Sequence, residues 1–359
     1  MLRGSNLSED VGQRLLDSQL VFLDPELAAT FERSTTKIGD LVFTCWGTIG
    51  QLGLIDSTSA FQNYVVSNKQ MKLSPDPDQV DSLFLYYNLS QPSMMNTVKS
   101  RAIGSTIPGF NLGQLKAIEV QLPSLAEQRA IAEVLGALDD KIAANTKLAE
   151  TAEALSQAVF RSIVGDALSA PLSATARFVN GKAFTKGASG TGRVVIRIAE
   201  LNSGLGGSTV FSDAEVGDDF LARPGDILFA WSGSLTLHRW FRSEGIVNQH
   251  IFKVVPNGYP SWLVYELLRD RLTYFKGIAA DKATTMGHIQ RGHLDELVYV
   301  PSRSSIDRVD ELMTSLWDRT LLAERENETL AATRDALLPQ LMSGILRVRD
   351  AQTYIEELV

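Results

Sequence analysis

An internal repeat limits the folds open to this chain more than any other feature of its sequence. The run GDLVF at 39–43 returns as GDILF at 225–229, each followed by a glycine at the same distance, and at the same offset residues 61–66 fall on residues 247–252. Both blocks are short runs of β-branched and aromatic residues between turn residues, which predicts β-strands. A sequence that repeats in this way is expected to fold as one structural unit used twice.

The repeat continues through two helical segments. Residues 83–86 match residues 262–265 as short helical patterns, and VQLPS at 120–124 matches VYVPS at 298–302. After each Pro-Ser comes a long stretch with helical periodicity, from 125 to 164 and from about 305 to 342. Ser124 and Glu127 form the S-x-x-E pattern that begins a helix, and Ser304 is predicted to cap the second helix, with Asp307 in its first turn.

The two long helices carry a heptad-like pattern that predicts a coiled coil. An asparagine stands at an equivalent place in each, Asn145 and Asn327, and a polar residue inside such a seam fixes the register of the two helices. If the second helix packs on the first, it must run back along it, so the pair is antiparallel. The predicted seam positions are Leu135, Leu138, Ile142, Ala149, Ala152, Leu155 and Val159, with Val309, Met313, Leu316, Thr320, Ala323 and Leu330.

These observations predict an α+β fold with two similar heads, joined by a long antiparallel coiled-coil helix pair and related by a pseudo-two-fold axis. The predicted segments are a first head at 1–124, a first spacer helix at 125–166, a second head at 167–302, a second spacer helix at 303–345 and a tail at 346–359. Two similar heads on a rigid spacer suit a target with two separated and different recognition patches. DNA with two unlike half-sites is such a target.

Composition excludes several classes of protein and raises one objection. The single cysteine, Cys45, rules out an intrachain disulfide, and no P-loop pattern for ATP hydrolysis occurs. No apolar run is long enough to span a membrane, so we expect a cytoplasmic protein. No motif indicates a metal or a cofactor of its own. The net charge of -8 argues against nucleic acid. However, most of the excess acid lies in the helices and tail, and the second head is mildly basic.

The order and duplication of these blocks resemble the DNA specificity subunits of type I restriction–modification systems. The resemblance rests on the two GD-containing blocks, on VNQHI at 247–251, on PSLAEQRAIA at 123–132 and on LLPQLMSG at 337–344. It implies two target-recognition domains that read the two parts of a split, asymmetric site in double-stranded DNA. It also implies that the chain is not catalytic and that its helices carry two methyltransferase subunits and further restriction subunits. Those partners would use S-adenosylmethionine, ATP and Mg.

Candidate DNA contacts lie in the loops that follow the repeated strands, where amides can pair with bases and cations with phosphate. The alternatives are that the amides satisfy turn backbone groups and that the loops are simply solvated. Trp240 and Trp262 are predicted to be core residues. The candidates are Trp231, Ser232, Asn248, Gln249, His250, Lys282, Thr284, Thr285, His288 and Arg291 in the second head, and Trp46, Gln62, Asn63, Lys99, Arg101, Ser105 and Thr106 in the first.

The two heads differ at their beginnings. The second opens with residues 172–184 before the block VIRIAELN at 195–202, whereas the first starts at Leu2 with a sequence like the latter block. The first head is therefore predicted to be truncated at its N-terminus. This leaves two alternatives to a complete DNA reader: a silent or truncated specificity cassette, and a coiled-coil adaptor that binds only proteins.

Overall fold

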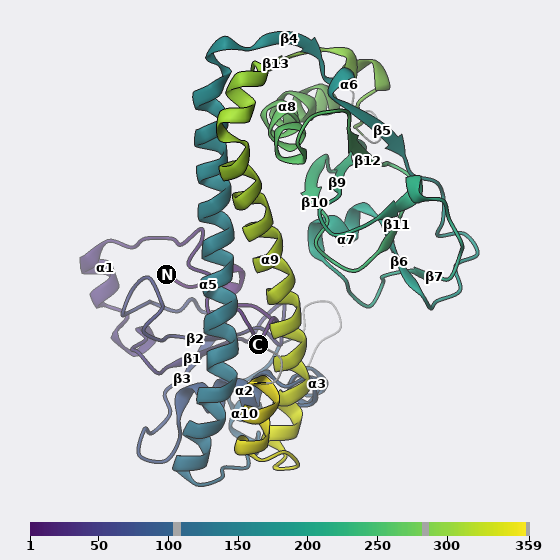
Figure 1. Cartoon of the computed structure of the whole chain (residues 1–359). Coiled ribbons are helices and arrows are strands. Elements are labelled where there is room, and N and C mark those ends of the chain that lie inside the picture. Colours follow the sequence, from purple (N-terminus) through teal and green to yellow (C-terminus); the bar gives the residue numbers. More distant parts are fainter. Residues whose placement is uncertain (103–108, 282–286, 357–359) are drawn as a thin grey trace. The chain divides into compact units, whose positions relative to one another are not determined.

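The structure is a computed structural model that describes residues 1–102, 109–281 and 287–356. The chain forms two compact units: unit 1 consists of Met1–Ala143 with Thr329–Val359, and unit 2 consists of Ala144–Glu328. Two long helices, α5 (Leu125–Ile163) and α9 (Arg303–Met342), contribute to both units (Figure 1). The predicted mixture of sheet and helix, with two long helices, is confirmed. The pseudo-two-fold relation stays a prediction.

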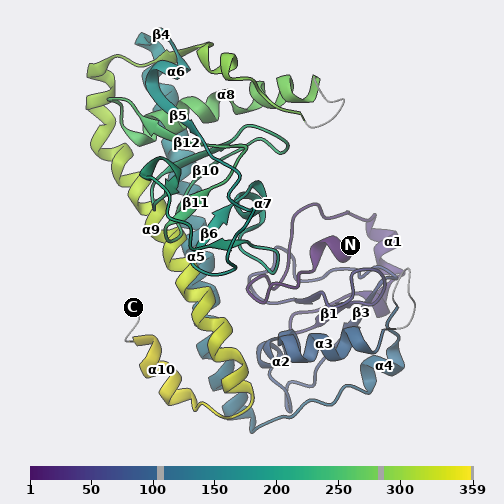
Figure 2. The same cartoon turned by 90° about the vertical axis from the view of Figure 1, so that its right-hand side faces the viewer.

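Unit 1 contains a small antiparallel sheet in the strand order β2-β1-β3. Strand β1 begins within the repeated block 39–43, and its Leu41 pairs with Leu54 on one side and with Leu73 on the other. Helix α2 packs against β2, and Figure 2 shows it next to the sheet that contains β1 and β3. The elements of unit 1, besides its parts of α5 and α9, are η1 (Gly4–Asn6), α1 (Pro25–Ala29), η2 (Glu32–Ser34), β1 (Leu41–Thr44), β2 (Leu52–Leu54), β3 (Gln70–Leu73), α2 (Ser82–Ser90), α3 (Pro92–Ser100), α4 (Leu112–Lys116) and α10 (Val348–Glu356).

Unit 2 is built on two four-stranded sheets, β10-β9-β12-β5 and β7-β6-β11-β8, and a two-stranded ribbon, β13-β4. Its elements, besides its parts of α5 and α9, are η3 (Val164–Asp166), β4 (Leu168–Pro171), α6 (Leu172–Thr175), β5 (Ala176–Asn180), β6 (Arg193–Ile196), α7 (Ile198–Ser203), β7 (Phe211–Ser212), η4 (Asp218–Phe220), β8 (Leu221–Ala222), β9 (Ile227–Ala230), β10 (Thr236–Arg239), β11 (Gly245–Val247), β12 (Ile251–Pro256), α8 (Ser261–Asp281), η5 (Arg291–Asp295) and β13 (Leu297–Val300).

Each unit has its own hydrophobic core, and in each the core joins the sheet to the long helices. In unit 1 the central strand β1 and helix α2 meet Leu135 and Leu138 of α5 and Leu337 of α9. In unit 2, strands β9 and β12 and helix α8 meet Phe160 of α5 and Met313 of α9. Trp240 and Trp262 are buried, as predicted. Burial of these apolar faces is what holds each head to its section of the helix pair.

The repeat is reproduced in the hydrogen bonds of the turn before the central strand. Gly39 and Gly225 both have positive φ angles, 93° and 94°, a conformation that glycine adopts without strain. The carboxylates of Asp40 and Asp226 accept backbone N–H bonds at 3.0 and 2.8 Å from the residues three positions earlier. A lysine completes both turns: Lys72 Nζ lies 3.7 Å from Asp40, and Lys253 Nζ lies 3.1 Å from Asp226. The turn before the central strand therefore has the same structure in both heads.

The two heads differ at the edge of this sheet. In unit 2, β5 pairs antiparallel with the outer side of β12, so that Phe252 lies opposite Asn180. In unit 1, among the residues that the structure describes, no strand pairs with the outer side of β3. Met71 and Leu73 of β3 are only partly buried as a result. The predicted N-terminal truncation stays a prediction.

Helices α5 and α9 run antiparallel in both units. In unit 1, Arg334 Nη1 of α9 donates to Asp139 Oδ1 of α5 at 2.8 Å. In unit 2, Asn145 Nδ2 donates to Glu326 Oε2 at 2.8 Å, and Asn327 Nδ2 donates to Thr146 Oγ1 at 3.1 Å. Both asparagines therefore hydrogen-bond across the pair, as a register-setting residue would.

One predicted seam position is wrong. Leu155 has 45% of its surface exposed, and Ser156 faces α9 instead, with its Oγ 3.7 Å from the sulfur of Met313. A straight α-helix has 3.6 residues per turn, so a strict seven-residue repeat drifts away from the contact line over several turns. The remaining buried positions that were predicted include Leu135, Ala152 and Leu330.

The helix starts confirm one predicted cap and correct the other. Ser124 Oγ accepts the backbone N–H of Glu127 at 3.3 Å, as predicted for α5. The cap of α9 is Ser302 and not Ser304: Ser302 Oγ accepts the N–H of Ser305 at 3.3 Å. Asp166 holds this cap, because its carboxylate accepts hydrogen bonds from the hydroxyls of Ser302 and Ser305.

Replacement of this cap gives a first test. We expect Ser302→Ala to lower the free energy of unfolding by about 1 kcal/mol, the usual effect of losing an N-cap side chain. Ser304→Ala is the matched control and should change it by less than about 0.5 kcal/mol, because the Ser304 hydroxyl does not cap the helix. Urea denaturation of both variants measures the difference. Equal effects of the two substitutions would contradict the assignment.

In the part of the chain that the structure describes, no helix is both long and apolar enough to cross a membrane.

Candidate nucleic-acid interface

In the second head, the predicted contact residues gather where β9 ends. The Trp231 indole ring lies 5.1 Å from the His250 ring and 6.4 Å from the His288 ring, measured between centroids. Its Nε1–H donates to Asn180 Oδ1 at 2.8 Å. Backbone bonds hold the three loops together: Trp231 N–H donates to the His250 carbonyl at 3.1 Å and Ile289 N–H to the Trp231 carbonyl at 3.0 Å. Residues far apart in sequence thus form one surface.

The segment 248–250 shows which of its side chains can reach a ligand. Asn248 is 6% exposed, and its Oδ1 accepts the N–H of Phe184 at 3.0 Å. The Asn248 amide oxygen therefore binds a backbone N–H of a neighbouring loop, which was the alternative to a base contact given above. Gln249 and His250 are exposed. His250 has a φ of 73°, a left-handed conformation that a non-glycine residue adopts only where its surroundings enforce it.

Other residues of the predicted surface have mixed roles. Ser232 is buried, and its backbone bridges to that of His288. Arg291 is exposed, but its Nη2 donates to the Phe178 carbonyl at 3.2 Å. Lys282, Thr284 and Thr285 lie outside the described residues.

Lys182 belongs to this surface, although the sequence did not single it out. It is exposed, its Nζ lies 4.4 Å from the centre of the Phe220 ring, and its carbonyl accepts the N–H of Gln249 at 2.9 Å. The available signal was the Gly181-Lys182 pair directly after a strand. Gly181 is required there, because a Cβ atom would lie only 2.1 Å from the Asn248 carbonyl oxygen.

We call the backbone hydrogen bonds that join these loops the loop frame. The first head has the same loop frame with different side chains. Cys45 takes the place of Trp231: its N–H donates to the Lys69 carbonyl at 2.8 Å, and its carbonyl accepts the N–H of Phe110 at 2.9 Å. The next residue, Trp46, is 52% exposed and packs over Gly109. Cys45 is buried, and burial raises the pKa of its thiol, so the group stays protonated and is a poor nucleophile.

The predicted counterparts of residues 248–250 in the first head are wrong. Ser67 N–H donates to the Leu2 carbonyl, as Asn248 N–H donates to the Ile196 carbonyl. The structural equivalents of residues 248–250 are therefore residues 67–69, and Gln62 and Asn63 lie before the loop. The sequence similarity at 61–66 does not correspond to structural equivalence, because the parallel bridge of Leu2 to Val66 sets the register of the strand. Asn68 and Lys69, both exposed, were missed for this reason.

The candidates Lys99 and Arg101 of the first head are also placed differently from the prediction. Lys99 lies in helix α3 and not in a loop, and its Nζ pairs with Glu9 at 2.8 Å. Arg101 follows the helix, and its Nη1 donates to the Ala117 carbonyl at 2.8 Å. Both cations therefore already have partners within the head. Ser105 and Thr106 lie outside the described residues.

Comparison with known proteins finds related sequences and one solved structure with the same fold. Residues 26–154 match the model of the type I restriction modification DNA specificity domain. Over 347 residues the chain is 23% identical to the type I restriction enzyme MjaIX specificity subunit of Methanocaldococcus jannaschii, a match that covers 87% of this chain and 78% of that protein. The chain is therefore similar, over residues 26–154 and over most of its length, to DNA specificity subunits of type I restriction–modification systems. The match to the HindI specificity subunit of Haemophilus influenzae is 30% identical over 102 residues, but spans only 28% of this chain and 22% of that subunit.

The fold is shared with a solved member of this specificity-subunit family. The S subunit of the type I restriction–modification system of M. genitalium superposes with a TM-score of 0.59 at 16% identity, over 95% of this chain and 91% of that one. The matched specificity domain begins in α1 of the first head and ends within α5. It therefore contains Trp46, Asn68 and Lys69.

The described residues offer no alternative metal chemistry at this surface. Within residues 1–102, 109–281 and 287–356, no group of three or more His, Cys, Asp or Glu side chains could hold a metal ion. The two histidines beside Trp231 face an aromatic ring instead. The groups that the described part of this surface presents are an amide, imidazoles, an indole and a lysine, which are groups that contact bases and phosphates in other proteins.

Proposed function

We propose that this chain is a non-catalytic, sequence-specific DNA-binding subunit that reads a bipartite, asymmetric site, with one part assigned to each head. One observation carries the proposal. The loop frame is the same in both heads, down to the hydrogen bonds of Trp231 and Cys45, but its exposed side chains differ: Gln249 and His250 in one, Asn68 and Lys69 in the other. A shared frame with different side chains suits two half-sites of different sequence.

The chemistry of these side chains fits the proposal. Gln249 and Asn68 carry amides, which can pair with adenine through two hydrogen bonds. Lys69 and Lys182 are exposed cations beside those amides, placed to meet phosphate oxygens. The net charge of the whole chain is therefore a poor guide, since only a local cluster needs to face the DNA.

The partners follow from the names of the relatives, which are subunits of type I restriction enzymes. We propose that the helices α5 and α9 carry two methyltransferase subunits and that restriction subunits join outside them. Adenine methylation and ATP-dependent cleavage would then reside in those partners, which would use S-adenosylmethionine, ATP and Mg. The cytoplasm is the expected location of such a complex.

The proposal is tested on the complex of this chain with a co-expressed methyltransferase subunit of a type I restriction–modification system. We expect the complex to protect a split DNA site and to methylate it. Gln249→Ala with His250→Ala should relax the choice of bases in one half-site, and Asn68→Ala with Lys69→Ala in the other, each at a cost of about 1–3 kcal/mol of discrimination per lost base contact. Sequencing of the methylated positions in the host genome provides the measurement.

The matched control is Gln62→Ala with Asn63→Ala, which lies outside the loop frame and should leave the methylated sequence unchanged. Three outcomes separate the alternatives. Protection of one half-site only would indicate a partial reader, as expected of a truncated cassette. Unchanged target choice in all variants would favour a protein-binding adaptor. Failure of every complex to bind DNA would exclude the proposed function.

A further inference from the structure

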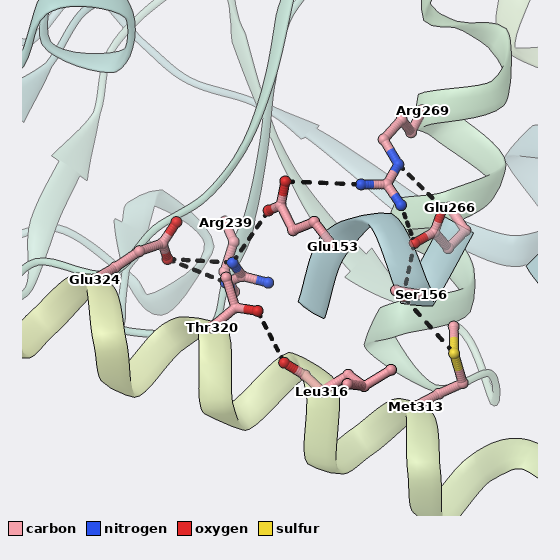
Figure 3. Close-up of polar contacts among 9 residues, drawn as sticks. All are labelled: Glu153, Ser156, Arg239, Glu266, Arg269, Met313, Leu316, Thr320 and Glu324. Atoms are coloured by element: carbon pink, nitrogen blue, oxygen red, sulfur yellow. Dashed lines mark hydrogen bonds and ion pairs between the residues drawn. The ribbon is translucent and has the colours of Figure 1, made fainter. Parts of the chain in front are cut away.

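The second head is fastened to the helix pair of unit 2 by a buried arginine. Arg239 lies at the end of β10, and its side chain is 3% exposed. Its Nη2 lies 3.2 Å from Glu324 of α9 and 3.4 Å from Glu153 of α5 (Figure 3). Its guanidinium also lies over the ring of Trp317, 4.6 Å from the centre. One cation of the head therefore bridges carboxylates from both long helices.

A second arginine extends the same contact from helix α8. Arg269 Nη1 lies 3.9 Å from Glu153, and its Nε donates to Glu266 at 3.0 Å (Figure 3). Glu266 is itself buried, and it accepts the hydroxyl of Ser156 at 2.9 Å. Arg269 is largely compensated by Glu266 of its own helix, and Arg242 pairs with Glu328 of α9. Arg239 is the cation that bridges Glu153 and Glu324.

The helix pair is acidic where the second head rests on it. We call Glu153 and Glu324 the second-head seat. Burial raises the pKa of the Glu324 carboxyl, Arg239 opposes that rise, and the negative charge of Glu153 adds to it. Without the arginine, two like charges would face each other in a partly buried place, which is unfavourable.

The corresponding place in unit 1 is built differently. We call Asp139 of α5 and Arg334 of α9 the first-head seat; their side chains are 3% and 5% exposed and lie 2.8 Å apart. The first head adds a neutral group, the Tyr87 hydroxyl, which donates to Asp139 at 2.5 Å. In this seat the charges of the two helices already compensate each other.

The repeat shows what the first head carries in place of the arginine. Arg239 pairs with Ile227 of β9, and Leu54 pairs with Leu41 at the equivalent place of β1. Leu54 is 2% exposed and belongs to the core of its unit. At this place in its sheet the first head therefore carries leucine and no cation; its Arg14 lies elsewhere and pairs with Asp56 and with Asp140 of α5.

We propose that Arg239 is a positioning residue that matches the second head, and not the first, to the acidic second-head seat. The two heads share a fold, so shape alone does not distinguish them. Charge does: a head with leucine at this position would leave Glu153 and Glu324 uncompensated. The pairing thus determines which head can occupy this part of the helix pair, independently of which DNA sequence the head reads.

The test places the residue of the first head in the second. Arg239→Leu is made in the full chain, both with the natural seat and with Glu153→Gln and Glu324→Gln, and hydrogen exchange is followed in β9, β10, α8 and residues 144–163. With the natural seat we expect exchange to become about 100-fold faster or more, since a buried charge loses its partner. With the neutral seat the same substitution should change exchange by less than about tenfold.

Arg177→Leu is the matched control, because it removes an arginine from an exposed pair with Asp219 in the same head. It should leave the hydrogen-exchange rates unchanged with either seat. Arg239→Lys, which keeps the charge, should fall between wild type and Arg239→Leu. Equal effects of Arg239→Leu in both backgrounds would overturn the proposal, because they would show that packing over Trp317 matters and the charge does not. If Arg239→Leu fails to fold, folding of the neutral-seat version supports the proposal, and failure of both overturns it.

Discussion

Gly181→Ala is expected to abolish sequence readout by the second head. A Cβ atom at this position would lie 2.1 Å from the carbonyl oxygen of Asn248 and 2.4 Å from that of Val247. Both obstacles are backbone atoms, so the strand that leads into Gln249 and His250 must shift. We expect the free energy of unfolding to fall by at least about 2 kcal/mol and the half-site of the second head to be lost.

The measurement combines urea denaturation with the genomic methylation pattern. Gly207→Ala is the control, because nothing lies within 4 Å of a Cβ atom there, and it should change the free energy of unfolding by less than about 0.5 kcal/mol. Unchanged methylation in Gly181→Ala would show that the loop at 248–250 does not read DNA. The half-site of the first head should persist, since it uses a separate loop frame.

Arg334→Leu should strongly destabilise unit 1. The substitution leaves Asp139 buried without its cation, and breaking such a pair costs about 3–5 kcal/mol. Burial already raises the pKa of Asp139, while Tyr87 and Arg334 hold it down. A raised pKa in the folded state means that this state binds the proton more tightly than the unfolded chain. The loss in free energy of unfolding caused by Arg334→Leu should therefore become smaller as the pH is lowered and Asp139 is protonated.

Two further variants make this prediction specific to the charge. Arg303→Leu changes an exposed arginine of the same helix, 67% exposed, and should cost less than about 1 kcal/mol. Arg334→Leu with Asp139→Asn should recover much of the lost stability, because a neutral amide can still accept the Tyr87 hydrogen bond. Urea titrations at several pH values compare the three chains. A loss no larger than that of Arg303→Leu would contradict the buried pair.

Local patterns were enough to predict the repeated elements of this fold. The blocks at 39–43 and 225–229 are central strands of equivalent sheets, and both long helices follow their Pro-Ser signals, because strand and helix periodicity and capping are properties of neighbouring residues. The burial of Trp240 and Trp262 follows from the same apolar patterns. The similarity to type I specificity subunits could also be predicted, since the blocks that carry it are local and occur twice in one order.

Contacts between distant residues decided the rest. The parallel bridge from Leu2 to Val66 sets the register of the first recognition loop, and it brings Asn68 and Lys69 to the place where similarity in sequence had put Gln62 and Asn63. The Asn248 side chain is held by its hydrogen bond with Phe184, and Arg239 is held by its ion pairs with Glu153 and Glu324. The sequence by itself determined that one unit is built twice. Only the tertiary structure decided which side chains each copy exposes and how each is fastened, because strand register and buried charge depend on partners far away in the chain.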